Sequence, residues 1–286
     1  MKIVSLLPSA TEICFALGAG DDVRGVTFEC DHPAAARERR IVSTTNLPAG
    51  LTPAEIDATV RERVAAGEDL YKLDRGALRA VDPDLVITQD LCAVCAIDVD
   101  DVEEALSYLG CQAKVVTTDP HDLTEVLESI EQIGQAIGRS SAGLLKELRH
   151  RLSAVEMRPR TGRRVLVLEW TDPPFAPGHW IPEMVEVAGG VSVLGSAGLR
   201  SSRTTWPAIA AARPEVVVVA PCGFGLDESA QLAEELLDQL PDVPVWAVDA
   251  NGYFARPGPR LVDGVEALAA ILHDEPVAPE VARRIR

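Results

Sequence analysis

The sequence predicts a two-lobed α/β protein with a parallel sheet in each lobe. Its 286 residues, 47% of them hydrophobic, are enough for two compact cores of about 100–150 residues each. Short apolar runs alternate with segments of helical periodicity, the pattern of parallel strands covered by helices on both faces. A weak internal repeat supports two related halves, which we expect to be Rossmann-like lobes with a ligand cleft between them.

The first lobe is expected to span residues 1–120. Its expected strands are short apolar runs ending in loop residues, and they lie at 3–7, 23–28, 41–43, 84–88 and 114–117. Its expected helices carry capping residues or helical periodicity, and they lie at 12–17, 52–66, 75–81 and 100–109. Strand and helix alternate throughout, so most of the sheet is expected to be parallel.

Residues 121–158 are expected to form a backbone helix that joins the lobes, because apolar residues recur there at helical spacing. If continuous, this helix would be roughly 50 Å long, longer than a single lobe requires. Three glycines weaken it, so a break near Gly138 is an alternative to one straight helix.

The second lobe is expected to span residues 159–286. Its expected strands lie at 165–169, 216–219 and 245–248, and its expected helices at 182–188, 206–212, 228–240 and 262–272. The remaining tail is rich in proline and charge, which predicts fraying. The internal repeat pairs 78–88 with 209–219: each is a helix end, a proline and a buried strand, followed by a cysteine, Cys92 or Cys222.

Charge and the N-terminal pattern narrow the function. The net charge of −17 argues against nucleic-acid binding, which needs clustered basic residues. The first eight residues read as a strand entering a turn rather than as an export leader, and no apolar run approaches the ~20 residues of a membrane helix. We therefore expect a cytoplasmic protein without membrane insertion.

Four of the six cysteines follow predicted strand ends. They are Cys30, Cys92, Cys95 and Cys222. The carboxyl ends of parallel strands meet at one edge, so these thiols are expected to face one another across the cleft. Four thiolates suit zinc or an iron–sulfur cluster, most simply a four-iron one, and His32 could replace one of them. The alternatives are buried cysteines without a ligand, or a redox dithiol at Cys92 and Cys95.

Aromatic residues are scarce, at 4% of the chain, yet several fall in second-lobe loops at the same predicted edge. They are Trp170, Trp180, Tyr253 and Phe254. Such residues commonly form the apolar wall of a small-molecule site, although they could equally fill the bases of the loops. Arg256 and Arg260 could hold a carboxylate or an amide, or could cap the last helix. No catalytic motif appears, so a binding protein is favoured over an enzyme.

Several segments resemble the periplasmic binding proteins of cobalamin and iron–siderophore importers, whose lobes are joined by one long backbone helix. Besides that helix, the segments that carry the resemblance are 4–12 (VSLLPSATE), 78–86 (LRAVDPDLV), 205–215 (TWPAIAAARPE) and 256–260 (RPGPR). In their order they span nearly the whole chain. The most similar subgroup is the cobalamin-binding-like proteins. That similarity implies a corrinoid between the lobes, with Ser9 and Thr11 on one side and Trp170, Trp180 and Tyr253 on the other.

Together these features predict a cytoplasmic branch of that family with extra cysteines. Its cleft would hold an iron–sulfur cluster or another metal through Cys30, Cys92, Cys95 and Cys222, and its partner would be a small metal-containing ligand. The same fold type is shared with nitrogenase-like cluster proteins, an analogy that supports the cluster. Two alternatives are a corrinoid-binding protein of an ABC-type uptake system, and a dithiol or cluster-dependent oxidoreductase.

Overall fold

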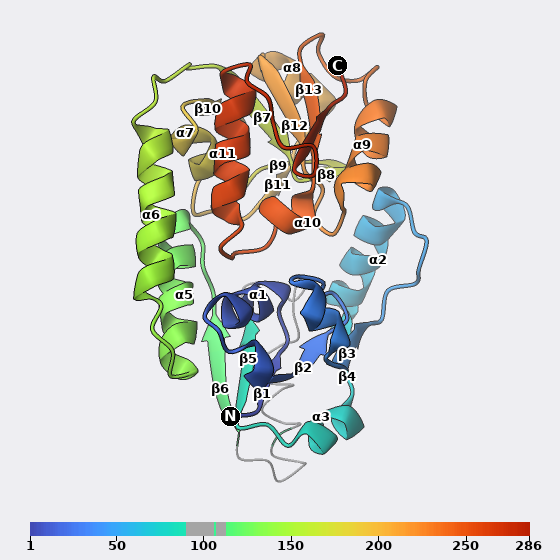
Figure 1. Ribbon diagram of the computed structural model, residues 1–286. Helices are drawn as coiled ribbons and strands as arrows, with labels where there is room; N and C mark the ends of the chain where they lie inside the picture. Colours follow the sequence, from blue (N-terminus) through green and yellow to red (C-terminus); the bar gives the residue numbers. More distant parts are fainter. Residues whose placement is uncertain (90–105, 107–112) are drawn as a thin grey trace. The chain divides into compact units, whose positions relative to one another are not determined.

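The computed structural model describes residues 1–89, 106 and 113–286 (Figure 1). The chain divides into two compact units. Unit 1 comprises Met1–Pro120 and Leu127–Leu145, and unit 2 comprises His121–Val126 and Lys146–Arg286. Each unit is built on a mainly parallel sheet with helices, which confirms the predicted fold class. The helix expected at 100–109 lies outside the described residues, apart from Leu106.

Unit 1 contains a six-stranded sheet in the order β4-β3-β2-β1-β5-β6. The strands are β1 (Ile3–Ser5), β2 (Val23–Thr27), β3 (Arg40–Thr45), β4 (Tyr71–Leu73), β5 (Leu85–Gln89) and β6 (Lys114–Thr118). All pair in parallel except β4, which runs antiparallel to β3. The carboxyl ends of the five parallel strands therefore share one edge of the sheet.

The helices of the first part of unit 1 are α1 (Pro8–Ala16), α2 (Pro53–Ala66) and α3 (Arg75–Val81). The start of α2 is as predicted: Thr52 caps it and exchanges hydrogen bonds with Glu55. The expected start of α1 at Glu12 is wrong. The helix begins at Pro8, because proline at the first helical position has the required φ and needs no N–H partner.

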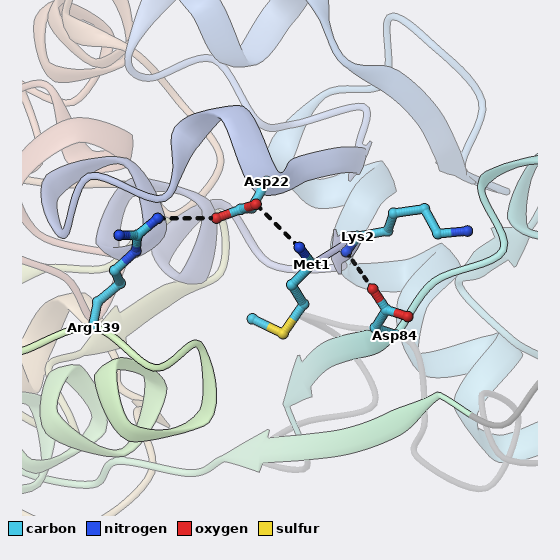
Figure 2. Close-up of polar contacts among 5 residues, drawn as sticks. All are labelled: Met1, Lys2, Asp22, Asp84 and Arg139. Atoms are coloured by element: carbon cyan, nitrogen blue, oxygen red, sulfur yellow. Dashed lines mark hydrogen bonds and ion pairs between the residues drawn. The ribbon is translucent and has the colours of Figure 1, made fainter.

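Polar contacts fasten the amino-terminal strand of unit 1 (Figure 2). The N-terminal amine lies 3.3 Å from Asp22 Oδ1, and Arg139 Nη2 lies 3.4 Å from Asp22 Oδ2. The Lys2 amide donates to Asp84 Oδ2 at 2.7 Å. Burial acts to raise the pKa of Asp22, but the two cationic partners outweigh it and hold the pKa below its ordinary value.

The expected backbone helix is two helices, α5 (Leu123–Ala136) and α6 (Ala142–Glu156). The break falls where the glycines predicted it. Gly138 has φ +68°, a left-handed conformation that suits glycine, and the Arg139 amide donates to the Gly134 carbonyl at 2.8 Å. One straight helix is therefore excluded, and both helices contribute residues to both units.

Unit 2 contains a five-stranded sheet in the order β10-β7-β12-β13-β14. The strands are β7 (Arg164–Leu168), β10 (Val191–Ser192), β12 (Val216–Val219), β13 (Val245–Val248) and β14 (Ala282–Arg284). All pair in parallel except β14, which runs antiparallel to β13. The expected frayed tail is thus wrong, because Ala282 pairs with Val248 and is buried.

Helices cover both faces of the unit 2 sheet (Figure 1). Val165 and Val167 pack with α7 (Ile181–Val187) and α11 (Leu261–Leu272), whereas Leu166 and Leu168 pack with α8 (Trp206–Ala212) and α9 (Leu226–Glu235). Successive side chains of a strand point to opposite faces, so a strand covered on both faces must be apolar throughout. This explains why β12, and β7 after Arg164, are unbroken apolar runs.

A small antiparallel sheet follows β7, in the order β11-β9-β8. Its strands are β8 (Trp170–Thr171), β9 (Pro174–Ala176) and β11 (Ser202–Arg203). The junction between the two sheets is Glu169, whose carboxyl group accepts hydrogen bonds from the Gly178 amide, at 2.8 Å, and from the Ser201 hydroxyl. Burial raises the pKa of Glu169 to about 7, against the opposing effect of these two hydrogen bonds.

One ion-pair network joins α6 to α11 within unit 2. Arg151 Nε donates to Glu266 Oε1 at 2.9 Å, and its Nη2 bonds both Glu266 Oε2, at 2.6 Å, and Asp263. The three side chains are partly buried, with 27 to 42% of their surface exposed.

Among the described helices, none is long and apolar enough to cross a membrane.

Replacing Arg151 by alanine is expected to lower the free energy of unfolding by about 1–2 kcal/mol. The substitution leaves two carboxylates facing each other on α11 without their cation, and partial exposure limits the cost. Urea denaturation followed by circular dichroism measures the change. Arg149→Ala, an exposed position on the same helix, is the matched control. Equal stability of the two variants would show that the network contributes nothing.

Replacing Glu169 by glutamine is expected to remove a pH dependence of stability. A carboxyl pKa raised from 4.5 to about 7 means that the folded protein binds a proton which the unfolded chain has released. In the wild type this contribution is present at low pH and is lost as pH rises from about 4.5 through about 7, on the order of 3 kcal/mol in all. Urea midpoints between these pH values, compared with the exposed control Glu234→Gln, test this. A variant with the wild-type slope would contradict it.

Candidate functional site

Three loops of unit 2 meet at one edge of its sheet. β7, β12 and β13 pair in parallel, so the loops after Leu168, Val219 and Val248 leave from the same edge. Each loop carries an aromatic side chain, respectively Trp170, Phe224 and Tyr253, and all three are partly exposed. We call this set the aromatic edge of unit 2.

Two members of the aromatic edge contact each other. The rings of Trp170 and Phe224 meet edge to face, with centroids 5.6 Å apart. The indole N–H of Trp170 donates to the Asp172 carbonyl at 3.1 Å, and the Asn251 amide donates to the Phe224 carbonyl at 3.2 Å. The rings are thus held by contacts within the loops, while part of their surface stays exposed.

Tyr253 lies at the end of the short helix α10 (Ala250–Tyr253), which Asp249 caps by accepting from the Gly252 amide at 2.9 Å. The guanidinium carbon of Arg260 lies 5.3 Å from the centre of the Tyr253 ring. Burial raises the pKa of Tyr253, and Arg260 acts in the opposite direction. The phenol is therefore a hydrogen-bond donor at neutral pH beside a cation.

Arg256, the other predicted cation, is partly exposed in the loop between α10 and α11. Its carbonyl accepts from the Gly258 amide at 2.8 Å, so this loop is a tight turn. Arg256 and Arg260 follow Tyr253 closely in this segment, and their role as ligand-binding cations stays a prediction. Polar groups and aromatic faces therefore occur together at this edge.

The remaining predicted aromatic residues are buried. Trp180 is 5% exposed, and its indole N–H donates to the Phe254 carbonyl at 2.8 Å. Phe254 is 1% exposed and belongs to the same core. Both side chains thus fill the bases of their loops, which was the alternative interpretation of the sequence. Trp180 also contacts His179, with ring centroids 5.6 Å apart, and His179 lies 6.4 Å from His121.

In unit 1 the predicted ligand residues Ser9 and Thr11 lie on α1. Ser9 is 4% exposed and Thr11 is fully buried. The Thr11 hydroxyl donates to the Leu7 carbonyl at 3.1 Å and lies 3.0 Å from Cys30 Sγ. The hydroxyl is thus engaged inside the unit, and a ligand role for these two residues stays a prediction.

The predicted cysteine site is only partly placed. Cys30 is buried in unit 1, Cys222 is exposed in unit 2, and Cys92 and Cys95 lie outside the described residues. Among residues 1–89, 106 and 113–286, no group of three or more His, Cys, Asp or Glu could hold a metal ion. Cys14 is a second buried thiol of unit 1 and interacts with Cys30. Burial raises the pKa of Cys14 to about 12, so its thiol is protonated at neutral pH.

Phe224 is the residue that our sequence interpretation missed. It lies five residues after the end of β12, in the same loop as Cys222. A signal was available, since an aromatic residue follows each of the three parallel strands. Phe224 completes that pattern between Trp170 and Tyr253.

Curated relatives match almost the whole chain. A vitamin B12-binding protein of Vibrio cholerae is 23% identical over 288 residues, covering 95% of this chain and 88% of the relative. An uncharacterised ABC transporter substrate-binding lipoprotein of Bacillus subtilis is 26% identical over 291 residues, covering 96% and 80%. No family model matches the chain.

Solved structures share the fold. A periplasmic heme-binding protein of Pseudomonas aeruginosa has a TM-score of 0.72 at 18% identity, covering 99% of this chain and 97% of that one. The periplasmic vitamin B12-binding protein of Vibrio cholerae has a TM-score of 0.58 at 21% identity, covering 96% of each chain. Similarity at this level of identity supports the two-unit fold.

These relatives overturn two predictions. The cytoplasmic location is wrong, because the relatives and structural neighbours are described as periplasmic proteins or as a lipoprotein. The main functional prediction, a cytoplasmic holder of an iron–sulfur cluster or metal, is wrong for the same reason, and the corrinoid alternative fits better. The strand-like pattern of the first eight residues was a weak ground for excluding export. Over nearly its whole length, this chain is similar to the extracytoplasmic substrate-binding proteins of ABC transporters.

Proposed function

We propose that this protein is the substrate-binding component of an ABC-type importer and that its ligand is a corrinoid of the cobalamin type. The aromatic edge of unit 2 is the structural observation that carries the proposal. Relatives named as vitamin B12-binding proteins that cover more than nine-tenths of the chain support it. In this role the protein would deliver its ligand to a membrane permease.

The chemistry of the aromatic edge suits such a ligand. A corrin ring is broad, with apolar faces and an amide-bearing rim, so its binding site needs flat apolar surface together with a few hydrogen-bonding groups. Trp170 and Phe224 provide flat apolar surface. The Tyr253 phenol and the arginines of the same loop provide the hydrogen-bonding groups. Aromatic side chains contribute large contact area at low cost in conformational entropy.

Heme is the second candidate ligand. The structural match to a periplasmic heme-binding protein has a higher TM-score than the match to the vitamin B12-binding protein, 0.72 against 0.58. Heme also has broad apolar faces, and its carboxylates could pair with Arg256 or Arg260. The two ligands differ at the rim, where heme bears carboxylates and cobalamin amides. A direct comparison of the two ligands separates the candidates.

Cyanocobalamin is expected to bind the purified protein with a 1:1 stoichiometry and a micromolar or tighter Kd. Isothermal titration calorimetry measures both quantities, and hemin is titrated in parallel under the same conditions. Saturable hemin binding without cobalamin binding would show that the ligand is heme and not a corrinoid. Binding of neither ligand would reject both.

Replacing Trp170 by alanine is expected to weaken cobalamin binding by about tenfold to a hundredfold, because a central aromatic contact typically contributes that much. Trp246→Phe is the control, since Trp246 lies within β13 and pairs with Arg284 of β14. Thermal denaturation of each variant confirms folding. An unchanged Kd for a folded Trp170→Ala protein would remove Trp170 from the site.

A further inference from the structure

The small sheet that carries Trp170 is fastened to the rest of unit 2 at Glu169. β8 follows Glu169 directly, and β9 and β11 extend the sheet away from it. The Glu169 amide donates to the Phe175 carbonyl at 3.2 Å, and its own carbonyl accepts from the Cys222 amide at 3.1 Å. The backbone of Glu169 therefore connects β9 and the loop after β12, which bears Phe224.

The side chain of Glu169 fastens the far ends of the same sheet. Gly178 lies two residues beyond the end of β9, and Ser201 immediately precedes β11. The carboxyl group accepts from both, through the Gly178 amide at 2.8 Å and the Ser201 hydroxyl. One partly buried carboxyl group thus bridges the end of one strand and the start of the next.

The two bridged segments are pressed together. A Cβ atom at Gly178 would lie 2.2 Å from the Ser201 amide nitrogen and 2.5 Å from the Leu199 carbonyl oxygen, so only glycine fits there. The His179 amide donates to the Leu199 carbonyl at 2.6 Å, and the Gly198 amide donates to the His179 carbonyl at 3.0 Å. The carboxyl group of Glu169 adds a side-chain link between this paired turn and the end of β7, beside the backbone bond from the Glu169 amide to Phe175.

We propose that Glu169 is a positioning residue for the ligand: its carboxyl group holds the small sheet closed against β7 and so fixes Trp170 and Phe224 at the aromatic edge. The ligand part of this inference rests on the proposed function. In this role Glu169 acts through the rings rather than by touching the ligand.

The Glu169 carboxyl group binds Gly178 and Ser201 through hydrogen bonds, without a salt bridge. Burial is the largest effect on the pKa of this carboxyl, and the hydrogen bonds from Ser201 and Gly178 oppose it. The titratable or charged residues on the surrounding segments are Asp172, His179, Arg200, Arg203 and Cys222. Glutamine has the same shape as a protonated Glu169, and it can accept from the Gly178 amide while donating to the Ser201 oxygen. Alanine can do neither.

The test compares Glu169→Ala with Glu169→Gln in the full chain. Hydrogen exchange of the Gly178 amide, measured without ligand, is expected to accelerate by about tenfold or more in the alanine variant and to stay near the wild-type rate in the glutamine variant. Cyanocobalamin binding, measured by calorimetry, is expected to weaken by about tenfold in the alanine variant and by less than about threefold in the glutamine variant. Glu234→Ala, an exposed position on α9, is the control.

Near wild-type exchange and affinity in the glutamine variant, together with the losses in the alanine variant, support the inference. A general loss of stability would not distinguish the side chain that keeps both hydrogen bonds from the one that loses them. A folded Glu169→Ala protein with wild-type exchange at Gly178 and wild-type affinity would overturn it. Should this variant not fold, Ser201→Ala removes one of the two donors, and an unchanged affinity would have the same meaning. If exchange responds as expected but no variant, including the wild type, binds cobalamin or hemin, the proposed function fails and the ligand part of the inference fails with it.

Discussion

The parallel pairing of β7 with β12 and of β12 with β13 is the constraint on which the candidate site depends. It forces three loops that are distant in the sequence to leave the sheet at one edge. Because these strands are covered on both faces, all of their side chains except Arg164 and the partly exposed Trp246 are buried in the core. Chemistry is therefore confined to the loops, and Trp170, Phe224 and Tyr253 are what the loops bring there.

The fold could be predicted because it depends on patterns that are local in the sequence. Buried parallel strands are continuous apolar runs, so the bounds of β12 and β13 were predicted correctly. The capping residue Thr52 correctly indicated the start of α2. Features set by distant partners could not be predicted in this way. β14 is such a feature: two of its three residues are exposed arginines, and only pairing with β13 makes this segment a strand.

The site was predictable only in part, for a similar reason. Position after a strand end predicted that Trp170 and Tyr253 lie at one edge of the sheet, where the structure has them, and their role as ligand contacts stays a prediction. The same criterion also selected four cysteines, whose proximity depends entirely on tertiary structure. The burial of Trp180 and Phe254 could not be predicted either, because an aromatic residue in a loop can face a ligand or fill the base of its loop. The role proposed for Glu169 depends on its hydrogen bonds with Gly178 and Ser201, which no sequence pattern connects to it.

The most decisive experiment is a crystal structure of the protein with bound cyanocobalamin, because it shows whether the aromatic edge of unit 2 receives a corrinoid. We expect the corrinoid in van der Waals contact with Trp170, Phe224 and Tyr253, and the Glu169 carboxyl still bonded to Gly178 and Ser201. A corrinoid bound to a surface that includes none of these three rings would show that the aromatic edge is not the binding site.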